Sequence, residues 1–285
     1  MLTMATTTLA TGTQTAELDA RVILAHVAGC DTEELHLRGE EMLAADQIAK
    51  CLMMVNRRAM HEPVQYITNH AEFMSLPFFV DANVLIPRPD TEILVEAVNA
   101  EFKTVAATGL DLCTGSGCIA ISIAHYCPKV KLTAIDNSTA ALAVARKNAV
   151  ANGIAERIEL VQSDMFTAFK QDNTECETDA LGAPFDFIAC NPPYITAAEM
   201  KTLAPNVRNF EPKTALEGGA DGLDFYRIIA REAKQYLKPG APLFLEIGCE
   251  QAESVKQLLT EAGFGSMTVL KDLAGLDRVV TALSP

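Results

Sequence analysis

The stretch CNPPYI (residues 190–195) places an amide side chain, two consecutive prolines and a tyrosine directly after an apolar run. Because proline lacks a backbone N–H and fixes φ, Pro192 and Pro193 are expected to end a strand and stiffen the following turn. Asn191 then stands at the carboxyl end of that strand, the edge at which open α/β sheets bind ligands. A side-chain amide held rigidly there suits a site that grips another amide or an amino group.

A glycine-rich turn, DLCTGSGCIA (residues 111–120), joins another apolar strand to a helix. Gly115 and Gly117 can adopt positive φ and let backbone N–H groups approach a ligand. Asp136 ends the next predicted strand, where a carboxylate can accept hydrogen bonds from both ribose hydroxyls of an adenosine. Its alternative role is the N-cap of the helix that follows.

Two cofactors are compatible with this turn. Its spacing fits the dinucleotide fingerprint G-x-G-x-x-G/A, so an NAD-dependent oxidoreductase is a competitor. Asp111, on the strand before the turn, favours a cofactor with a cationic amino-acid end, such as S-adenosylmethionine (AdoMet). Asp164 ends a third strand, where it can accept from the exocyclic amine of adenine while Met165 or Phe166 packs on the ring. The alternative, equally compatible with the sequence, is that Asp164 begins a turn and contacts no ligand.

With AdoMet beside the glycine turn, its methyl group would point towards Asn191. A nitrogen to be methylated needs its N–H groups held so that its lone pair faces the methyl. The Asn191 side-chain oxygen and the Pro192 carbonyl can accept those hydrogens, and Tyr194 can cover or stack on a planar amide. No strong general base is required, because positioning and electrostatics do most of the work. The alternative is that CNPPYI only ends a strand.

The elements that hold these residues follow from hydrophobic periodicity. Residues 16–60 carry apolar positions at helical spacing, whereas the Thr-rich residues 1–15 are expected to be an irregular lead-in. Residues 71–89 are rich in Phe, Val and Ile and are interrupted by Pro and Asn, which predicts a short hairpin that acts as a connector. Asp90 is the expected N-cap of the next helix.

From about residue 108, continuous apolar strands alternate with amphipathic helices, which predicts a parallel sheet covered on both faces. We expect seven strands, with one antiparallel strand at the edge because the last two are joined without room for a helix. The predicted domains are an N-terminal helical domain (1–70), a hairpin connector (71–90) and an AdoMet-dependent α/β domain (91–285).

Composition narrows the functional class. The chain has 285 residues, 49% of them hydrophobic, and a net charge of −14 without any basic run, which argues against a nucleic-acid substrate. No stretch is apolar enough to span a membrane, and the first residues do not resemble a secretory signal. The eight cysteines occur singly, so no metal site is predicted and the reducing cytoplasm is the expected compartment.

Asn-Pro-Pro-Tyr after the fourth strand resembles the motif of amino methyltransferases with a Rossmann-like fold. Within that group, residues 61–285 closely resemble the N5-glutamine methyltransferases that modify class-1 peptide chain release factors. LIPRPDTE together with NPPYI is far more specific than either motif alone. The segments that carry the resemblance are PVQYI, EFMSLPFFV, LIPRPDTE, DLCTGSGCIA, NPPYI, FEPKTAL, GGADGLDFYR, LEIG and DLAGLDRVV.

The resemblance implies a seven-stranded class I methyltransferase sheet, AdoMet as methyl donor, and a glutamine of a Gly-Gly-Gln loop as acceptor. It also implies an N-terminal helical domain that helps recognise the release factor. It assigns the cofactor loop to Thr114, Gly115, Ser116 and Gly117, with Asp136 on the ribose. The rest of the predicted cofactor site is Asp111, Cys113, Asp164, Met165 and Asn191. The predicted catalytic residues are Asn191, Pro192 and Tyr194.

The acceptor grip is assigned to Asn191, Pro192, Pro193 and Tyr194. Arg88, in LIPRPDTE, is expected to line the pocket as well, with a rigid connector as the alternative. A cytoplasmic monomer without direct nucleic-acid contact is the expected form.

Three residues depart from the family pattern. Cys113 stands where the loop usually has glycine, which could lower cofactor affinity. Met165 replaces an aromatic residue of some members. Asn69 stands where glycine is common, but asparagine tolerates positive φ.

Other functions remain as alternatives. The first is a methyltransferase that acts on a glutamine of a ribosomal protein. The second is a nucleic-acid N6-adenine methyltransferase, which would have to flip its base and bind a polyanion. The remaining alternatives are an oxidoreductase and a protein module that binds a ligand without catalysing a reaction.

Overall fold

The computed structural model describes residues 1–37, 42–170 and 184–285. Two compact units are present: Met1–His70 with Leu203–Phe210, and Ala71–Thr202 with Glu211–Pro285. Cys176 and most of the acidic segment around it lie outside the described residues. Among the residues described, no helix is long and apolar enough to cross a membrane.

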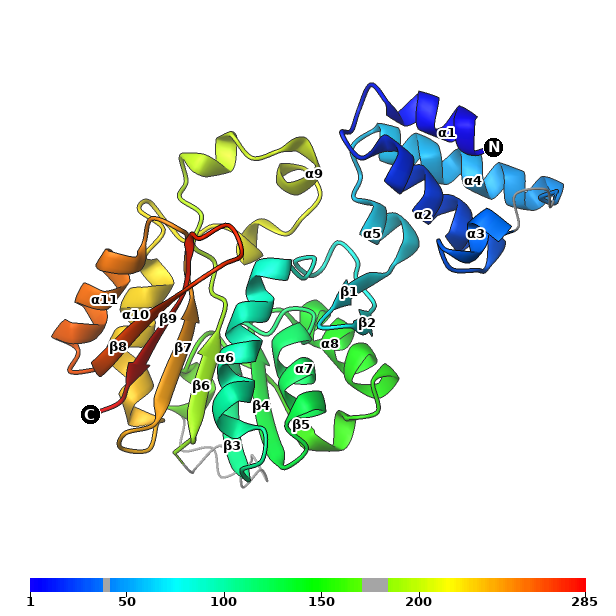
Figure 1. The fold of residues 1–285 in the computed structure, drawn as a ribbon. Coiled ribbons are helices and arrows are strands. Elements are labelled where there is room, and N and C mark those ends of the chain that lie inside the picture. The colour runs from blue at the N-terminus through cyan, green and yellow to red at the C-terminus, as the bar shows by residue number, and fades with distance from the viewer. Residues whose placement is uncertain (38–41, 171–183) are drawn as a thin grey trace. The chain divides into compact units, whose positions relative to one another are not determined.

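The first unit is helical (Figure 1). Its helices are α1 (Leu2–Leu9), α2 (Ala16–Ala28), α3 (Glu34–Leu37), α4 (Ala45–Ala59) and α5 (Val64–Thr68), and the short α9 (Pro205–Arg208) clusters with them. The prediction of helices between residues 16 and 60 is confirmed. The irregular lead-in is wrong, because Ala5 and Leu9 lie four residues apart on one face of α1 and are fully buried in the core shared with α2 and α4.

The second unit begins with the expected hairpin, β1 (Ala71–Phe73) paired antiparallel with β2 (Leu76–Phe78). A seven-stranded sheet follows, as predicted, in the order β5-β4-β3-β6-β7-β9-β8. Its strands are β3 (Ala107–Leu112), β4 (Val130–Asp136), β5 (Ile158–Gln162), β6 (Phe187–Cys190), β7 (Pro242–Glu246), β8 (Gly265–Lys271) and β9 (Asp277–Leu283). The strands from β5 to β7 in this order are parallel.

The antiparallel strand is not at the edge of the sheet, as we expected, but one position in from it. β9 pairs antiparallel with both β7 and β8, and β8 forms the edge. The connection from β7 through α11 (Ala252–Glu261) leaves one position free beside β7. Because the turn between β8 and β9 is too short for a crossover, β9 runs back into that position.

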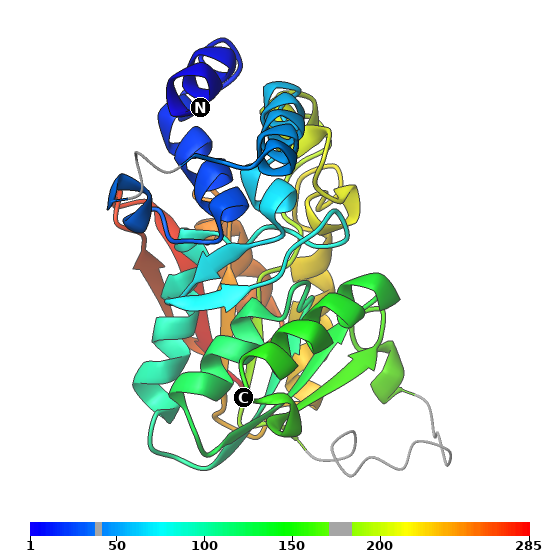
Figure 2. The same ribbon diagram turned by 90° about the vertical axis from the view of Figure 1, so that its right-hand side faces the viewer.

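Helices cover both faces of the sheet (Figure 1). Residues of α6 (Glu92–Phe102) and α7 (Cys118–Tyr126) pack with Phe187 and Phe244 on one face. Figure 2 shows this helical layer, in teal and green, nearest the viewer together with α8 (Thr139–Ala151). On the other face, residues of α10 (Asp224–Glu232) and α11 pack with Leu110 and Leu243. Because helices cover both faces, a ligand can approach this sheet at the ends of its strands.

The start of α6 differs from the prediction. Pro89–Thr91 forms a 3-10 turn that runs directly into α6, whose N-cap is Thr91 and not Asp90. Thr91 is buried, whereas Asp90 is exposed.

Strand order reverses between β3 and β6, because β3 leads outward to β4 and β5 while β6 begins the other half of the sheet. In open α/β sheets, ligands bind in the crevice at the carboxyl ends of the strands beside such a reversal. The residues that follow β3, β4, β5 and β6 therefore form the candidate site.

Candidate active site

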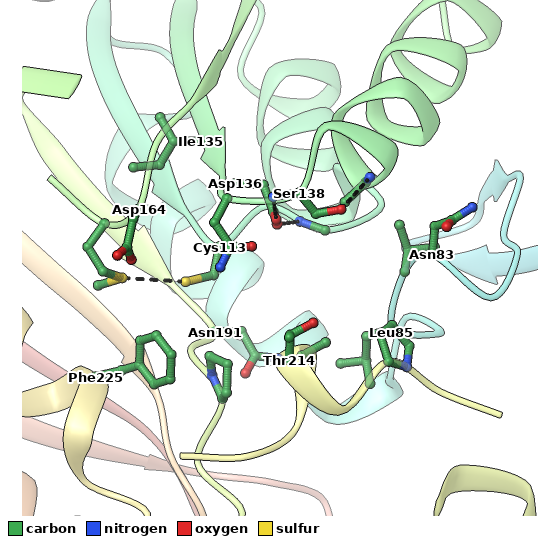
Figure 3. Close-up of a pocket in the computed structure, with 18 of the residues that line it drawn as sticks. Asn83, Leu85, Cys113, Ile135, Asp136, Ser138, Asp164, Asn191, Thr214 and Phe225 are labelled. Atoms are coloured by element: carbon green, nitrogen blue, oxygen red, sulfur yellow. Dashed lines mark hydrogen bonds between the residues drawn. The ribbon is translucent and has the colours of Figure 1, made fainter. Parts of the chain in front are cut away.

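A pocket lies at the carboxyl ends of β3, β4, β5 and β6. Figure 3 shows Cys113 and Asp136 across the cavity from Asn191, Thr214 and Phe225. The predicted site residues that line it are Cys113, Gly115, Asp136, Asp164, Met165, Asn191 and Pro193. The predicted residues outside the lining are Arg88, Asp111, Thr114, Ser116, Gly117, Pro192 and Tyr194.

The two glycines of the loop have different environments. Gly115 has φ +54°, and a Cβ added there would meet no protein atom within 4 Å, so this side of the loop is open. A Cβ at Gly117, at φ +81°, would lie 2.9 Å from the Ile121 side chain and 3.2 Å from that of Ala145. Gly115 thus lets a ligand approach the backbone, whereas Gly117 lets the loop pack against α7 and α8.

Asp111 braces the loop from beneath instead of facing the pocket. Its side chain is fully buried, and Oδ2 accepts hydrogen bonds from Thr114 Oγ1 at 2.6 Å and from Ala120 N at 3.2 Å. Burial raises the pKa of Asp111 to about 7, and its Oδ1 is buried without a partner. Thr114 is buried by the same contact. Ser116 is also buried, and its carbonyl accepts from Asn148.

Asp136 faces the pocket with both carboxylate oxygens anchored. Oδ2 accepts from Gly115 N and Oδ1 from Ser138 N, each at 2.9 Å. The side chain that caps α8 is Ser138, which accepts from Ala141 N, so the alternative of an N-cap at Asp136 is wrong. Burial is the largest cause of the raised pKa of Asp136. Each oxygen keeps a lone pair for a ligand hydroxyl.

The residues after β5 both form a turn and line the pocket. The Ser163 hydroxyl donates to Met165 O at 2.7 Å, and the exposed Asp164 side chain faces the cavity. Met165 also lines the cavity, with its sulfur 3.8 Å from that of Cys113. Phe166 does not line it, because its ring is buried against Tyr236 at a centroid distance of 4.9 Å.

Asn191 is held at the pocket by a rigid turn. Its Nδ2 donates to Thr91 Oγ1 at 3.1 Å. The glycine-rich segment 217–222 supports the turn from behind: a Cβ at Gly218 would lie 2.6 Å from Pro193 O, and one at Gly222 would lie 2.3 Å from Tyr194 O. Only glycine permits this close approach between the two backbones.

Tyr194 does not line the pocket but points towards the end of β7. Its hydroxyl donates to Glu246 Oε1 at 3.3 Å, and burial raises its pKa above the ordinary value. Glu246 is 1% exposed, and burial raises its pKa to about 7. A stacking contact between Tyr194 and a ligand in this cavity is therefore not part of the geometry.

Arg88 lies outside the pocket lining as well. Its guanidinium contacts Glu211 Oε1 at 2.5 Å, and Glu211 Oε2 accepts from Ile86 N at 3.3 Å. The Glu211 side chain is fully buried in this pair. Residues 83–85 and 212–215 supply lining residues from the two segments so joined. Arg88 thus ties two walls of the pocket together, which agrees with the connector alternative better than with a ligand contact.

Both parts of the chain match known protein families. Residues 1–68 match the family model "PrmC N-terminal domain", and residues 88–207 match "Methyltransferase small domain". A protein of Cereibacter sphaeroides named release factor glutamine methyltransferase is 43% identical over 97% of this chain and 94% of its own length. A protein of Thermodesulfovibrio yellowstonii with the same name is 40% identical over 92% of this chain and 90% of its own length.

The chain belongs to the release factor glutamine methyltransferase family. This membership confirms the family that the sequence motifs indicated. It also confirms the prediction that the protein is a methyltransferase.

More distant solved structures share the fold. A methyltransferase from Pyrococcus furiosus superposes with a TM-score of 0.53 at 18% identity, over 85% of this chain and 99% of that chain. The hMettl16 catalytic domain, in complex with MAT2A 3′UTR hairpin 1, superposes with a TM-score of 0.58 at 15% identity, over 92% of this chain and 90% of that chain. At these identities the likeness shows the class I methyltransferase fold alone.

Two positions at which this family was expected to have glycine do adopt a left-handed backbone. Asn69 ends α5 at φ 53°, and Cys113 begins the glycine-rich loop after β3 at φ 60°. Asparagine tolerates this conformation, whereas cysteine is strained in it. Cys113 follows the last residue of β3 and packs against the cluster that contains Leu112 and Cys190.

Several lining residues escaped the sequence interpretation. Phe225, from α10, and Thr214, after β6, lie inside the quoted motifs GGADGLDFYR and FEPKTAL, so a signal for them was present. Leu85, from the loop after the hairpin, also lies inside a quoted motif, LIPRPDTE, whereas Asn83 from the same loop lies in none of them. The described residues hold no cluster of three or more His, Cys, Asp or Glu side chains that could bind a metal ion.

Proposed function

We propose that this chain transfers a methyl group from AdoMet to the side-chain amide nitrogen of a glutamine in the Gly-Gly-Gln loop of a class-1 peptide chain release factor. The relatives named release factor glutamine methyltransferase support the substrate class over nearly the whole length of the chain. The observation that carries the chemistry is the anchored amide of Asn191, which faces the glycine loop and Asp136 across one cavity.

The pocket fits AdoMet. Gly115 leaves the loop open to a ligand, Asp136 has lone pairs for two ribose hydroxyls, and Ile135 with Met165 supplies apolar wall. The charged side chains of the lining are the two carboxylates of Asp136 and Asp164, with no lysine or arginine among them. Such a lining suits a cationic cofactor better than the pyrophosphate of NAD, which supports the methyltransferase over the oxidoreductase.

The residues of this chain position the acceptor nitrogen. An amide nitrogen is a poor nucleophile because its lone pair is delocalised into the carbonyl. When bound, AdoMet supplies an electrophilic methyl group. The Asn191 side-chain oxygen and the Pro192 carbonyl accept the two N–H groups of the glutamine, which turns the nitrogen lone pair towards that methyl. Pro193 lines the pocket and stiffens the turn, so this geometry exists before the substrate arrives.

Cys113→Gly is expected to leave AdoMet affinity equal or higher. Without the Cβ, the backbone at this position can approach a ligand more closely. The relief of about 1–2 kcal/mol of left-handed strain at φ 60° and the cost of about 0.5–1 kcal/mol for the freedom of glycine in the unfolded chain change the folding stability and not the affinity. Calorimetric titration of both proteins with AdoMet measures the affinity, with Gly115→Ala as a matched control that should weaken it. A large loss of affinity in Cys113→Gly would mean that the thiol holds the cofactor.

Methyl transfer from labelled AdoMet to a class-1 release factor tests the proposed function. We expect transfer to the factor and none to a variant whose Gly-Gly-Gln glutamine is replaced by alanine. The rate should depend weakly on salt, because the proposed substrate is a protein and not a polyanion, and the enzyme itself carries a net charge of −14. Transfer to duplex DNA, ribosomal RNA or a ribosomal protein in preference to the factor would overturn the assignment.

A further inference from the structure

A buried residue of the motif LIPRPDTE contacts Asn191 without lining the cavity. Thr91 is 2% exposed and does not line the pocket. Its Oγ1 nevertheless accepts the hydrogen bond from Asn191 Nδ2 at 3.1 Å, although the two residues lie 100 positions apart in the chain. Thr91 is held in place by the 3-10 turn that leads into α6. A residue of the connector motif thus touches the amide that grips the acceptor.

Glu246 determines the direction of this hydrogen bond. The Thr91 hydroxyl has one proton, and the carboxyl group of Glu246 can accept it, because its Oε2 is buried and has no hydrogen-bond partner among the described residues. The same hydroxyl lowers the pKa of that carboxyl group. Its oxygen is then left to accept. Only the nitrogen end of the Asn191 amide can donate to it, so the oxygen end must face away from Thr91. The hydroxyl of Tyr194 donates to the same carboxyl group and holds it at the end of β7.

We propose that Thr91 is a positioning residue that sets the orientation of the Asn191 side chain, with Glu246 and Tyr194 fixing the hydroxyl of Thr91. The inference rests on the proposed function, in which Asn191 Oδ1 accepts an N–H of the glutamine. If the amide were turned over, Nδ2 would present two N–H groups to the N–H groups of the acceptor, and no hydrogen bond could form. The hydroxyl of Thr91 therefore excludes the non-productive orientation.

The comparison of Thr91→Val with Thr91→Ser tests this role. Valine removes the hydroxyl group and keeps the shape of the side chain, whereas serine keeps the hydroxyl group and removes the methyl group. We expect Thr91→Val to lower kcat for methylation of the release factor about 10- to 100-fold, the scale of a displaced reacting group. The Kd for AdoMet and the KM for the release factor should change little. Thr91→Ser should retain most of the kcat of the wild type.

AdoMet titration and thermal unfolding of each variant show whether it is folded. If Thr91→Val is not folded, Thr91→Ala takes its place in the same comparison, because the smaller alanine side chain leaves room for a water molecule beside Glu246. Equal kcat in the wild type and the hydroxyl-free variant would overturn the inference, as would an equal loss in Thr91→Ser, which would indicate packing of the methyl group. Absence of transfer by the wild type would instead overturn the proposed function, so the two failures are distinguishable.

Discussion

Replacing Asn191 by alanine is expected to lower kcat for methylation of the release factor by about 100-fold or more, the scale of losing one preorganised polar group in an active site. The variant loses one of two acceptors for the glutamine N–H groups, while the prolines of the turn and the glycine segment behind it stay in place. Because the interaction strengthens at the transition state, kcat falls and AdoMet binding changes little. Steady-state kinetics with calorimetric titration of AdoMet measures both quantities.

Asn191→Asp is the matched control for this variant. It keeps an acceptor for the glutamine, but it adds a negative charge and loses the N–H group that donates to Thr91. The charge is expected to tighten AdoMet, whose positive charge vanishes on transfer, and so to slow the chemistry. Near-normal turnover by Asn191→Ala would show that CNPPYI only ends a strand.

Asp136→Ala is expected to weaken AdoMet binding by about 1.5–3 kcal/mol, the range of hydrogen bonds to charged groups. At about 1.4 kcal/mol per tenfold change, this corresponds to roughly 10- to 150-fold in Kd. The loss arises because the ribose hydroxyls lose their acceptors and Gly115 N loses the carboxylate that holds the loop.

Asp164→Ala provides a comparison, because its exposed carboxylate faces the same cavity and should contribute less. Calorimetric titration of the three proteins measures the difference. Unchanged binding by Asp136→Ala would exclude it as the ribose acid, and tight NADH binding by the wild type without AdoMet binding would favour the oxidoreductase.

Local patterns were sufficient to predict the sheet and the residues at its edge. Parallel strands place the residues that follow them at one edge, so Cys113, Asp136, Asp164 and Asn191 could be brought together from their positions after apolar runs. The motifs LIPRPDTE and NPPYI then indicated the family.

The differences between the sequence interpretation and the structure concern residues whose partners are distant in the sequence. Tyr194 was expected to face the acceptor, but its hydroxyl contacts Glu246, 52 positions further along the chain. Arg88 was expected in the pocket, but the buried carboxylate of Glu211 attracts its guanidinium, 123 positions away. The contact of Thr91 with Asn191 is of the same kind. No periodicity encodes such pairs, because they depend on tertiary packing.

The position of the transferred methyl group on the release factor identifies the acceptor atom. The enzyme is incubated with a class-1 release factor and AdoMet that carries an isotopically labelled methyl group, and the digested factor is sequenced by tandem mass spectrometry. We expect a single labelled methyl group on the side-chain nitrogen of the glutamine in the Gly-Gly-Gln loop. A methyl group on any other residue of the factor, or an unlabelled factor when the enzyme is shown to bind AdoMet, would contradict it.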